Sequence, residues 1–160
     1  MSRMDGPWKD LEQDLNGIGA RLTANLQLTT AQNAEIVRKV LVKHIQNQDL
    51  QWAKLNPKYL VYKKRNRLST ATLIATSEFL QSITTQMSSD KLSAFVGVLR
   101  NAKRKDGESG VLVAEIHEFG SRARNIPARP LFRPTFAEIK PEVADRFKAA
   151  IKEALETVGT

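Results

Sequence analysis

The first fifty residues repeat apolar side chains at steps of three and four, which is the spacing of one face of an α-helix. One stripe begins just after Pro7. Another begins after Thr29, a candidate N-cap with Gln32 three residues later to close a capping box. We therefore predict two helices here, joined near Thr29 as an antiparallel hairpin. The two stripes are Trp8, Leu11, Leu15, Ile18 and Leu22, and Ile36, Val37, Val40, Leu41, His44 and Ile45.

Two short apolar runs in the middle of the chain are typical of β-strands. They are Ile83–Met87 and Ala94–Leu99, with a polar turn at Ser88–Lys91 between them. Val111–Val113 is expected to continue as a further strand. The segment Arg100–Gly110 is basic, contains glycine and lacks apolar anchors. We therefore predict a mobile loop there, which projects as a hairpin tip between two strands.

Residues 113–120 have the pattern of a short helix followed by a stop. Apolar side chains recur at helical spacing as far as Phe119, and Gly120 comes directly after it. Glycine readily adopts the left-handed conformation that ends many helices. The sequence therefore predicts a helix end at Gly120.

An extended elbow, Ile126–Pro130, is predicted next. Its two prolines push the residues before them out of the helical region of backbone space. A helix can resume from Leu131, with Pro134 tolerated only near the first turn. The last helix is predicted to start near Pro141, because an apolar stripe at helical spacing follows it.

Length and composition fit one α+β domain. The chain has 160 residues, of which 41% are hydrophobic. We expect residues 1–160 to form a single domain, with an N-terminal helical hairpin at 1–50 and an α+β core at 52–160. The hairpin and the C-terminal helix would pack on a small, mainly antiparallel sheet. No apolar run approaches the ~20 residues that cross a bilayer, and the N-terminus lacks the apolar core of a secretory signal, so no membrane partner is expected.

Four blocks carry a resemblance to a known family. The most specific reads I-P-A-R-P-L-F-R-P, from Ile126 to Pro134, and it follows A-x-x-H-E-F-G, from Ala114 to Gly120. Upstream stand W-x-x-L-x-P-x-Y-L-x-Y-K, from Trp52 to Lys63, and T-L-I-A-T-S-E-F-L-Q-S-I, from Thr72 to Ile83. Together these blocks resemble the head–tail joining and tail-completion proteins of tailed bacteriophages, including the Mu-type virion morphogenesis proteins.

The chain departs from that family's pattern at two places. Leu131-Phe132 stands where Phe-Leu is commoner, and Thr76-Ser77 stands where Thr-Gly is usual. The resemblance covers roughly the region from Trp52 to the C-terminus.

The resemblance implies a structural protein of the virion neck, assembled in the host cytoplasm. Members of the family form rings at the junction of head and tail. The expected partners are therefore further copies of the chain, in a ring expected to be a hexamer, and the neighbouring neck, adaptor and tail terminator or tube proteins. The resemblance does not distinguish contractile, long flexible and short tails. The residues that we expect at the subunit interface are His117, Glu118, Phe119, Arg129, Pro130, Phe132 and Arg133.

The net charge of +8 favours an anionic partner, either nucleic acid or an acidic protein surface. For any one basic cluster a solvated surface is the plainer interpretation, but three clusters in loops favour contacts with DNA phosphates that are independent of sequence. In a ring, the loop with Arg100, Lys103, Arg104 and Lys105 is predicted to face the DNA channel; the alternative is a solvated loop on the outer wall of the ring. The other two clusters are Lys63, Lys64, Arg65 and Arg67, and Arg122, Arg124, Arg129 and Arg133.

Two arginines of the third cluster have a second interpretation. Prolines hold Arg129 and Arg133 on a rigid elbow. A rigid guanidinium suits bidentate pairing with a carboxylate, which is the role that we predict for this pair.

Catalytic patterns are missing from the sequence. His117-Glu118 suggests a zinc protease, but that chemistry needs a second histidine one turn later, and Ser121 occupies that position. The chain has no cysteine, which excludes disulfides and thiolate chemistry, and it has no glycine-rich phosphate loop. We therefore expect no enzymatic activity, no metal and no cofactor.

One alternative comes from a different functional class, a non-specific cytosolic nucleic-acid-binding module. It depends on charge and loop placement alone. Tight, strongly salt-dependent binding of a random duplex by the free protein would favour it over the ring protein.

Overall fold

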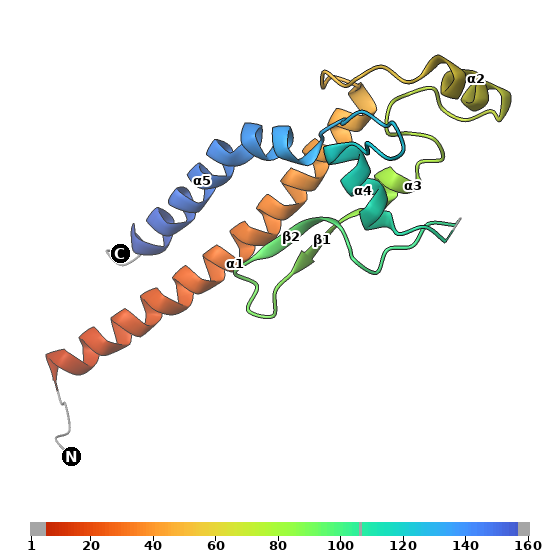
Figure 1. Ribbon diagram of the computed structural model, residues 1–160. Coiled ribbons are helices and arrows are strands. Elements are labelled where there is room, and N and C mark those ends of the chain that lie inside the picture. The colour runs from red at the N-terminus through yellow and green to blue at the C-terminus, as the bar shows by residue number, and fades with distance from the viewer. Residues whose placement is uncertain (1–5, 106, 157–160) are drawn as a thin grey trace. The chain divides into compact units, whose positions relative to one another are not determined.

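The computed structural model describes residues 6–105 and 107–156 and, of Pro7, only the backbone. Over these residues the fold is α+β, as predicted, with five α-helices and one two-stranded sheet (Figure 1). None of the helices described is long and apolar enough to span a membrane. In chain order the elements are α1 (Pro7–Asn47), α2 (Pro57–Arg65), α3 (Glu78–Ser82), β1 (Ile83–Met87), β2 (Ala94–Val98), α4 (Gly110–Phe119) and α5 (Phe132–Glu156).

The chain divides into two compact units. Unit 1 comprises Met1–Asn33, Met87–Ala94 and Lys140–Thr160, and unit 2 comprises Ala34–Gln86 and Phe95–Ile139. In unit 1 the Asn25 side chain donates a hydrogen bond to the Ala150 carbonyl of α5 at 3.4 Å. All four blocks that carry the family resemblance lie in unit 2.

The predicted N-terminal hairpin is wrong, because α1 is one unbroken helix of 41 residues (Figure 1). Thr29, the predicted N-cap, is buried inside it, and so is Thr30. The Thr30 hydroxyl donates to the Leu26 carbonyl at 2.8 Å, so this polar side chain is satisfied within the helix. The two threonines therefore pack inside the fold, and the chain does not reverse its direction at them.

The two middle strands are confirmed. β1 and β2 form a hairpin whose turn is closed by hydrogen bonds between Ser88 and Ser93. So short a connection joins antiparallel strands. The part of α1 in unit 2 holds β1 from one side, because Arg38 donates to the Ile83 carbonyl at 3.0 Å and Thr85 donates to Glu35 at 2.7 Å.

The further strand at Val111–Val113 is wrong, because these residues form the first turns of α4. Ser109 is the N-cap, and its hydroxyl accepts a hydrogen bond from the Leu112 N–H at 3.4 Å. The preceding loop therefore joins a strand to a helix. A bridge between Lys103 and Ser109 and a hydrogen bond from Gly110 N–H to the Ala102 carbonyl fold it back on itself.

The separate last helix near Pro141 is also wrong. α5 runs without interruption from Phe132 to Glu156 with Pro141 inside it (Figure 1). Proline removes one helical hydrogen bond, a cost that packing on both sides can offset. Ile139 is buried before it, and Ala150 and Ala154 are buried after it.

The apolar core described is concentrated in unit 2. One helix face of α1 and residues from the hairpin, α4 and α5 supply it, whereas the predicted first stripe in unit 1 leaves Trp8, Leu11 and Leu15 exposed. The buried apolar residues of unit 2 are Ala34, Val37, Leu41, Ile45, Leu73, Ile83, Val98, Ala114, Leu131 and Ile139.

Candidate functional site

Glu118 of α4 caps the first turn of α5. Its carboxylate accepts hydrogen bonds from the backbone N–H groups of Leu131 at 2.8 Å, Phe132 at 2.9 Å and Arg133 at 3.0 Å. The first N–H groups of a helix have no partner within it, and the positive end of the helix dipole favours a carboxylate there. The buried Glu118 therefore ties the two helices together.

Gly120 ends α4 as predicted, but its backbone is not in the left-handed helical conformation that the prediction invoked. Its φ of 77° and ψ of 178° lie in a region that is open essentially only to glycine. The backbones of Ser121 and Ile126 then exchange two hydrogen bonds at 2.8 and 2.9 Å, which closes the turn. A Cβ on Gly120 would lie 2.9 Å from both the Ile126 oxygen and the Ala128 nitrogen. The glycine is therefore needed for its backbone angles and for the close approach of the elbow.

Arg129 and Trp52 attach the elbow to an earlier part of the chain. The Arg129 guanidinium is buried and donates to the carbonyls of Ala53 at 2.9 Å and Lys54 at 3.1 Å. The Trp52 indole donates to the Pro130 carbonyl at 2.7 Å. We call the assembly of Trp52, Glu118, Gly120 and Arg129 the corner.

The predicted carboxylate pairing is wrong for Arg129, whose partners are neutral carbonyls. For Arg133 a carboxylate partner is present, because its Nε lies 3.3 Å from an oxygen of Glu118. That pair lies within one chain and is made through one nitrogen only. The Arg133 guanidinium also lies 5.0 Å from the centre of the Phe119 ring.

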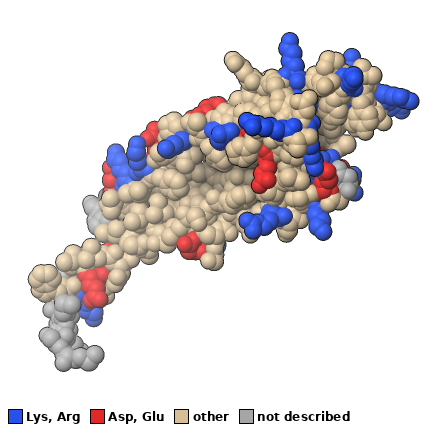
Figure 2. Space-filling model, in the orientation of Figure 1, with Lys and Arg blue, Asp and Glu red and all other residues tan. Residues whose placement is uncertain are grey.

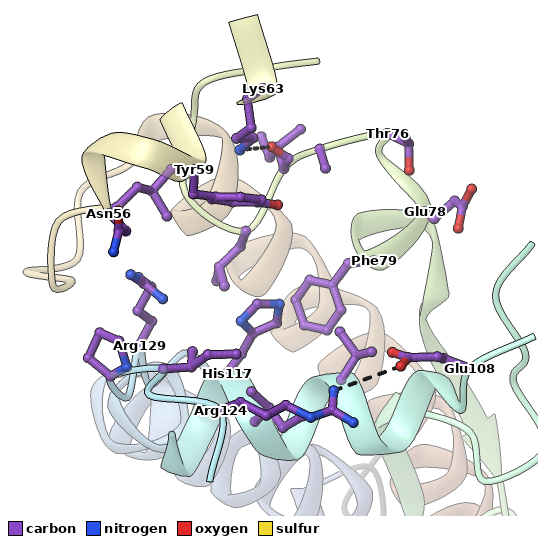
Figure 3. A pocket seen from close by; sticks show the side chains of 18 of the residues that line it. Asn56, Tyr59, Lys63, Thr76, Glu78, Phe79, Glu108, His117, Arg124 and Arg129 are labelled. Carbon is purple, nitrogen blue, oxygen red and sulfur yellow. Dashed lines mark hydrogen bonds and ion pairs between the residues drawn. The ribbon is translucent and has the colours of Figure 1, made fainter. Parts of the chain in front are cut away.

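A cavity of about 770 Å³ lies beside the corner and belongs entirely to unit 2. Residues of α2, α3, α4 and the elbow line it. Figure 3 shows the His117 imidazole pointing into it, with Phe79 to one side and Arg129 to the other. The rings of Phe79 and His117 meet edge to face with centroids 5.1 Å apart.

Buried positive charge gathers at one end of this cavity. Lys63 is almost fully buried, and its ammonium group donates to the carbonyls of Ala71 and Ile74 at 2.7 Å each. Burial lowers the pKa of Lys63, and the charge of Arg129 lowers it further. Burial likewise lowers the pKa of Arg129 itself.

His117 is neutral in this surrounding. Burial, and then the charges of Arg129 and Arg104, lower the pKa of His117 to about 4. Its Nδ1 is buried and has no hydrogen-bond partner. His117 therefore offers a neutral ring with one unused nitrogen beside two cations.

His117 is expected to make stability depend on pH in a mildly acidic range. The unfolded chain, with an ordinary pKa of 6.5, takes up a proton there that the folded chain, with a pKa of about 4, does not. Stability contributed by the neutral ring is thus complete above pH 6.5 and falls as the pH drops toward 4. We expect a loss of about 2 kcal/mol between about pH 7.5 and pH 5. Urea unfolding at both pH values measures it.

His117→Gln is the matched variant for that measurement, since glutamine cannot take up the proton. The loss over this pH range should shrink by about 2 kcal/mol in the variant. An unchanged loss would show that His117 is not held neutral in the folded chain.

The predicted interface residues divide into buried and exposed ones. The Glu118 carboxylate and the Arg129 guanidinium are taken up inside their own chain, and His117 faces the cavity, so these three side chains do not offer an exposed contact surface. Phe119 is 65% exposed. Phe132 is half-buried and stacks on the exposed Phe136 with ring centres 6.5 Å apart. Pro130 is half-buried, and Arg133 is exposed.

The predicted DNA-channel loop also needs a correction. Arg100, Lys103 and Lys105 are exposed. Arg104 is half-buried and lies 3.7 Å from a carboxylate oxygen of Glu78, so it belongs to the wall of the cavity. The basic surface of this loop therefore has three members.

A stronger basic surface surrounds α2. The segment Gln51–Ser77 holds six lysines and arginines and no acidic residue. Lys63, one of the six, is buried, whereas Lys58, Lys64, Arg65 and Arg67 are exposed. Figure 2 shows basic side chains projecting over this part of the chain, at the upper right of the view. We call these four exposed residues the α2 basic surface.

Some of this site could not be found from the sequence. Lys63 stands in a run of mostly basic residues that ends at Arg67, and nothing in the sequence marks it as different from the others. Only the fold shows that Lys63 is the buried one. The lack of acidic residues across Gln51–Ser77 was a signal that could have been used. No group of three or more His, Cys, Asp or Glu side chains is placed to hold a metal ion among the residues that the structure describes.

Comparisons with known proteins give one distant relative. The chain is similar to an uncharacterized protein of Methanocaldococcus jannaschii, with 26% identity over 121 residues that cover 74% of this chain and 83% of that protein. No family model matches the chain. No solved structure matches it significantly.

Proposed function

We propose that this chain is a structural protein of the phage neck, a tail-completion or head–tail joining protein. In this proposal several copies, expected to be six, form a ring that connects tail to head around the DNA channel. The observation that carries the proposal is the corner. Trp52 and Pro130, which are 78 residues apart, meet there, and so do the two blocks that contain Glu118 and Arg129.

This convergence supports the resemblance because each hallmark residue has a physical reason. Glu118 caps a helix, Gly120 adopts angles closed to other residues, and Arg129 ties the elbow to the Trp52 block. A chance match of short motifs would not be expected to place them in mutual contact. These contacts support our proposal that the chain shares the fold of that family.

Exposed aromatic side chains at the end of α4 and in the first turns of α5 suit a contact between copies. Phe119 and Phe136 are both exposed, and Phe132 stacks on Phe136. Contiguous exposed apolar groups commonly mark interaction sites. In a ring, such a surface contacts a different surface of the next copy. The ring closes when the repeated rotation from one copy to the next brings the last copy back to the first.

We expect the purified chain to form a closed oligomer that Phe119→Ser weakens. An exposed phenylalanine contributes little to the fold of the single chain, so the variant should keep its secondary structure while its assembly shifts toward monomers. Native mass spectrometry over a range of concentrations measures both species.

Val61→Ser is the matched control, because Val61 of α2 is 66% exposed and Phe119 is 65% exposed. If both variants weaken oligomer assembly equally, the contact between copies is not made by the surface around Phe119. A chain that stays monomeric at every concentration, with or without particles, would contradict the ring.

DNA would contact the ring through phosphates, and the α2 basic surface is the better candidate for that contact. Replacing Lys64, Arg65 and Arg67 with serine should reduce retention of a random duplex by the assembled ring. Each lost phosphate contact should lower the salt slope of binding by about 0.9. The comparison variant carries serine in place of Arg100, Lys103 and Lys105, and its retention of the duplex should fall less.

Tight binding of DNA by free monomers would favour the alternative, a non-specific cytosolic nucleic-acid-binding module.

A further inference from the structure

The cavity in unit 2 has a cationic end without an anion. Lys63 and Arg129 are both buried there, and among the residues described their hydrogen-bond acceptors are backbone carbonyls only. An ammonium group has three N–H donors and a guanidinium has five, so donors of both groups stay available. The Lys63 ammonium group also lies 5.5 Å from the centre of the Tyr59 ring. Burying charges without a counter-charge is costly, and an anion bound in the cavity near them would offset part of that cost.

His117 adds a hydrogen-bonding atom at the same end. Its Nδ1 is buried without a partner, although buried polar atoms normally have one. Figure 3 shows the ring directed into the cavity, near the Arg129 guanidinium. A ligand oxygen at this place would meet the unused nitrogen and the Arg129 guanidinium together.

The rest of the cavity suits a flat apolar group. Tyr59 and Phe79 form walls on either side of the space in front of His117 (Figure 3). The acidic residues of the lining, Glu78 and Glu108, pair with arginines, at 3.7 Å to Arg104 and at 3.8 Å to Arg124. Thus negative charge in the lining is matched locally, whereas the charges of Lys63 and Arg129 are not.

We infer that this cavity binds a small organic oxyanion, a carboxylate or phosphate attached to a planar ring. The oxyanion would lie against Arg129 and the Nδ1 of His117, with its ring between Tyr59 and Phe79. Lys63, whose ammonium group lies over the Tyr59 ring at 5.5 Å from its centre, would add positive charge from behind that ring. The volume of about 770 Å³ falls within the range of small-molecule pockets in proteins. This inference does not depend on the proposed function, since ring formation and ligand binding are measured separately.

The experiment uses the full chain and four probes, namely benzoate, phenyl phosphate, inorganic phosphate and benzyl alcohol. The chain has only two histidines, so imidazole NMR signals report on His117 directly, with His44 as an internal reference. We expect benzoate or phenyl phosphate to raise the pKa of His117 by at least about one unit, because an added anion favours the protonated ring. We expect dissociation constants of about 1 mM or tighter.

The other two probes separate the parts of the inference. Benzyl alcohol has the same ring without the charge and should bind at least about tenfold more weakly. Inorganic phosphate lacks the ring and should also bind more weakly than phenyl phosphate. Equal binding of benzyl alcohol and benzoate would overturn the anion site. No saturable shift of the His117 signals with benzoate and phenyl phosphate, up to about 10 mM, would overturn the ligand site altogether.

Lys63→Met tests the cationic end, with Lys64→Met as the matched control on the exposed face of the same helix. We expect about tenfold weaker benzoate binding for the first variant and no change for the second. Equal binding by all three chains would contradict the assignment of Lys63. If Lys63→Met does not fold, the comparison of benzoate with benzyl alcohol on the natural chain decides the inference by itself.

Discussion

Glu118→Ala is expected to lower the free energy of unfolding by about 3–5 kcal/mol, the largest effect of any single substitution considered. The substitution leaves the N–H groups of Leu131, Phe132 and Arg133 without their acceptor at a helix end where the first of these hydrogen bonds is buried and the other two are partly buried. Each unsatisfied buried donor costs about 1–3 kcal/mol, and water can reach only some of them after the change. Urea unfolding near neutral pH measures the loss.

The same cap should weaken in acid. Burial by itself raises the pKa of Glu118, but the hydrogen bonds from Arg133, Leu131 and Phe132 outweigh that effect and lower the pKa below its ordinary value of 4.5. A carboxyl group with a lowered pKa stabilises the folded chain above the unfolded pKa, and that stability is lost as the pH falls through the folded value. The difference between the natural chain and Glu118→Ala should therefore shrink below about pH 4.5.

Glu115→Ala is the control for this prediction. Glu115 lies on the exposed side of the same helix, so its substitution should change the unfolding free energy by less than about 0.5 kcal/mol. If both substitutions cost the same, Glu118 is not the cap that holds α5.

Gly120→Ala is expected to cost about 2–4 kcal/mol. The backbone angles of Gly120 penalise any side chain by about 1–3 kcal/mol. The new Cβ would also lie 2.9 Å from two backbone atoms of the elbow, which cannot rotate away as a side chain can. Thermal and urea unfolding, with circular dichroism of the remaining helix, measure the loss.

Gly19→Ala serves as the control, because it is expected to change the free energy of unfolding in the opposite direction. Gly19 lies within α1, and a Cβ there would meet nothing within 4 Å. Alanine should therefore stabilise this helix by about 0.5–1 kcal/mol. Gly120→Ala giving a change of the same sign as Gly19→Ala would contradict the role assigned to the corner.

Short sequence patterns correctly predicted the elements whose conformation depends mainly on neighbouring residues in the chain. Gly120 ended its helix because no other residue suits its angles, and the two middle strands formed where the apolar runs lie. The errors came where packing outweighs a local signal. Thr29 has the chemistry of an N-cap but is buried inside α1, and Pro141 has the chemistry of a helix start but lies within α5.

The site was harder to predict because side chains of one type have different surroundings. Lys63 and Lys64 are neighbours in sequence, yet one is buried against carbonyls and the other is exposed. Arg129 and Arg133 both lie by prolines, but only Arg133 has a carboxylate partner. Periodicity and composition do not distinguish such pairs, because the partners come from distant parts of the chain.

The proposed neck function is tested most directly on particles. Tailed particles purified from cells that carry the gene can be analysed by quantitative peptide mass spectrometry and electron microscopy, with and without the gene. If the chain is a neck protein, each particle contains a fixed number of copies of it, and loss of the gene yields separate heads and tails. Particles that lack the chain, or joined and infectious particles formed without the gene, would contradict it.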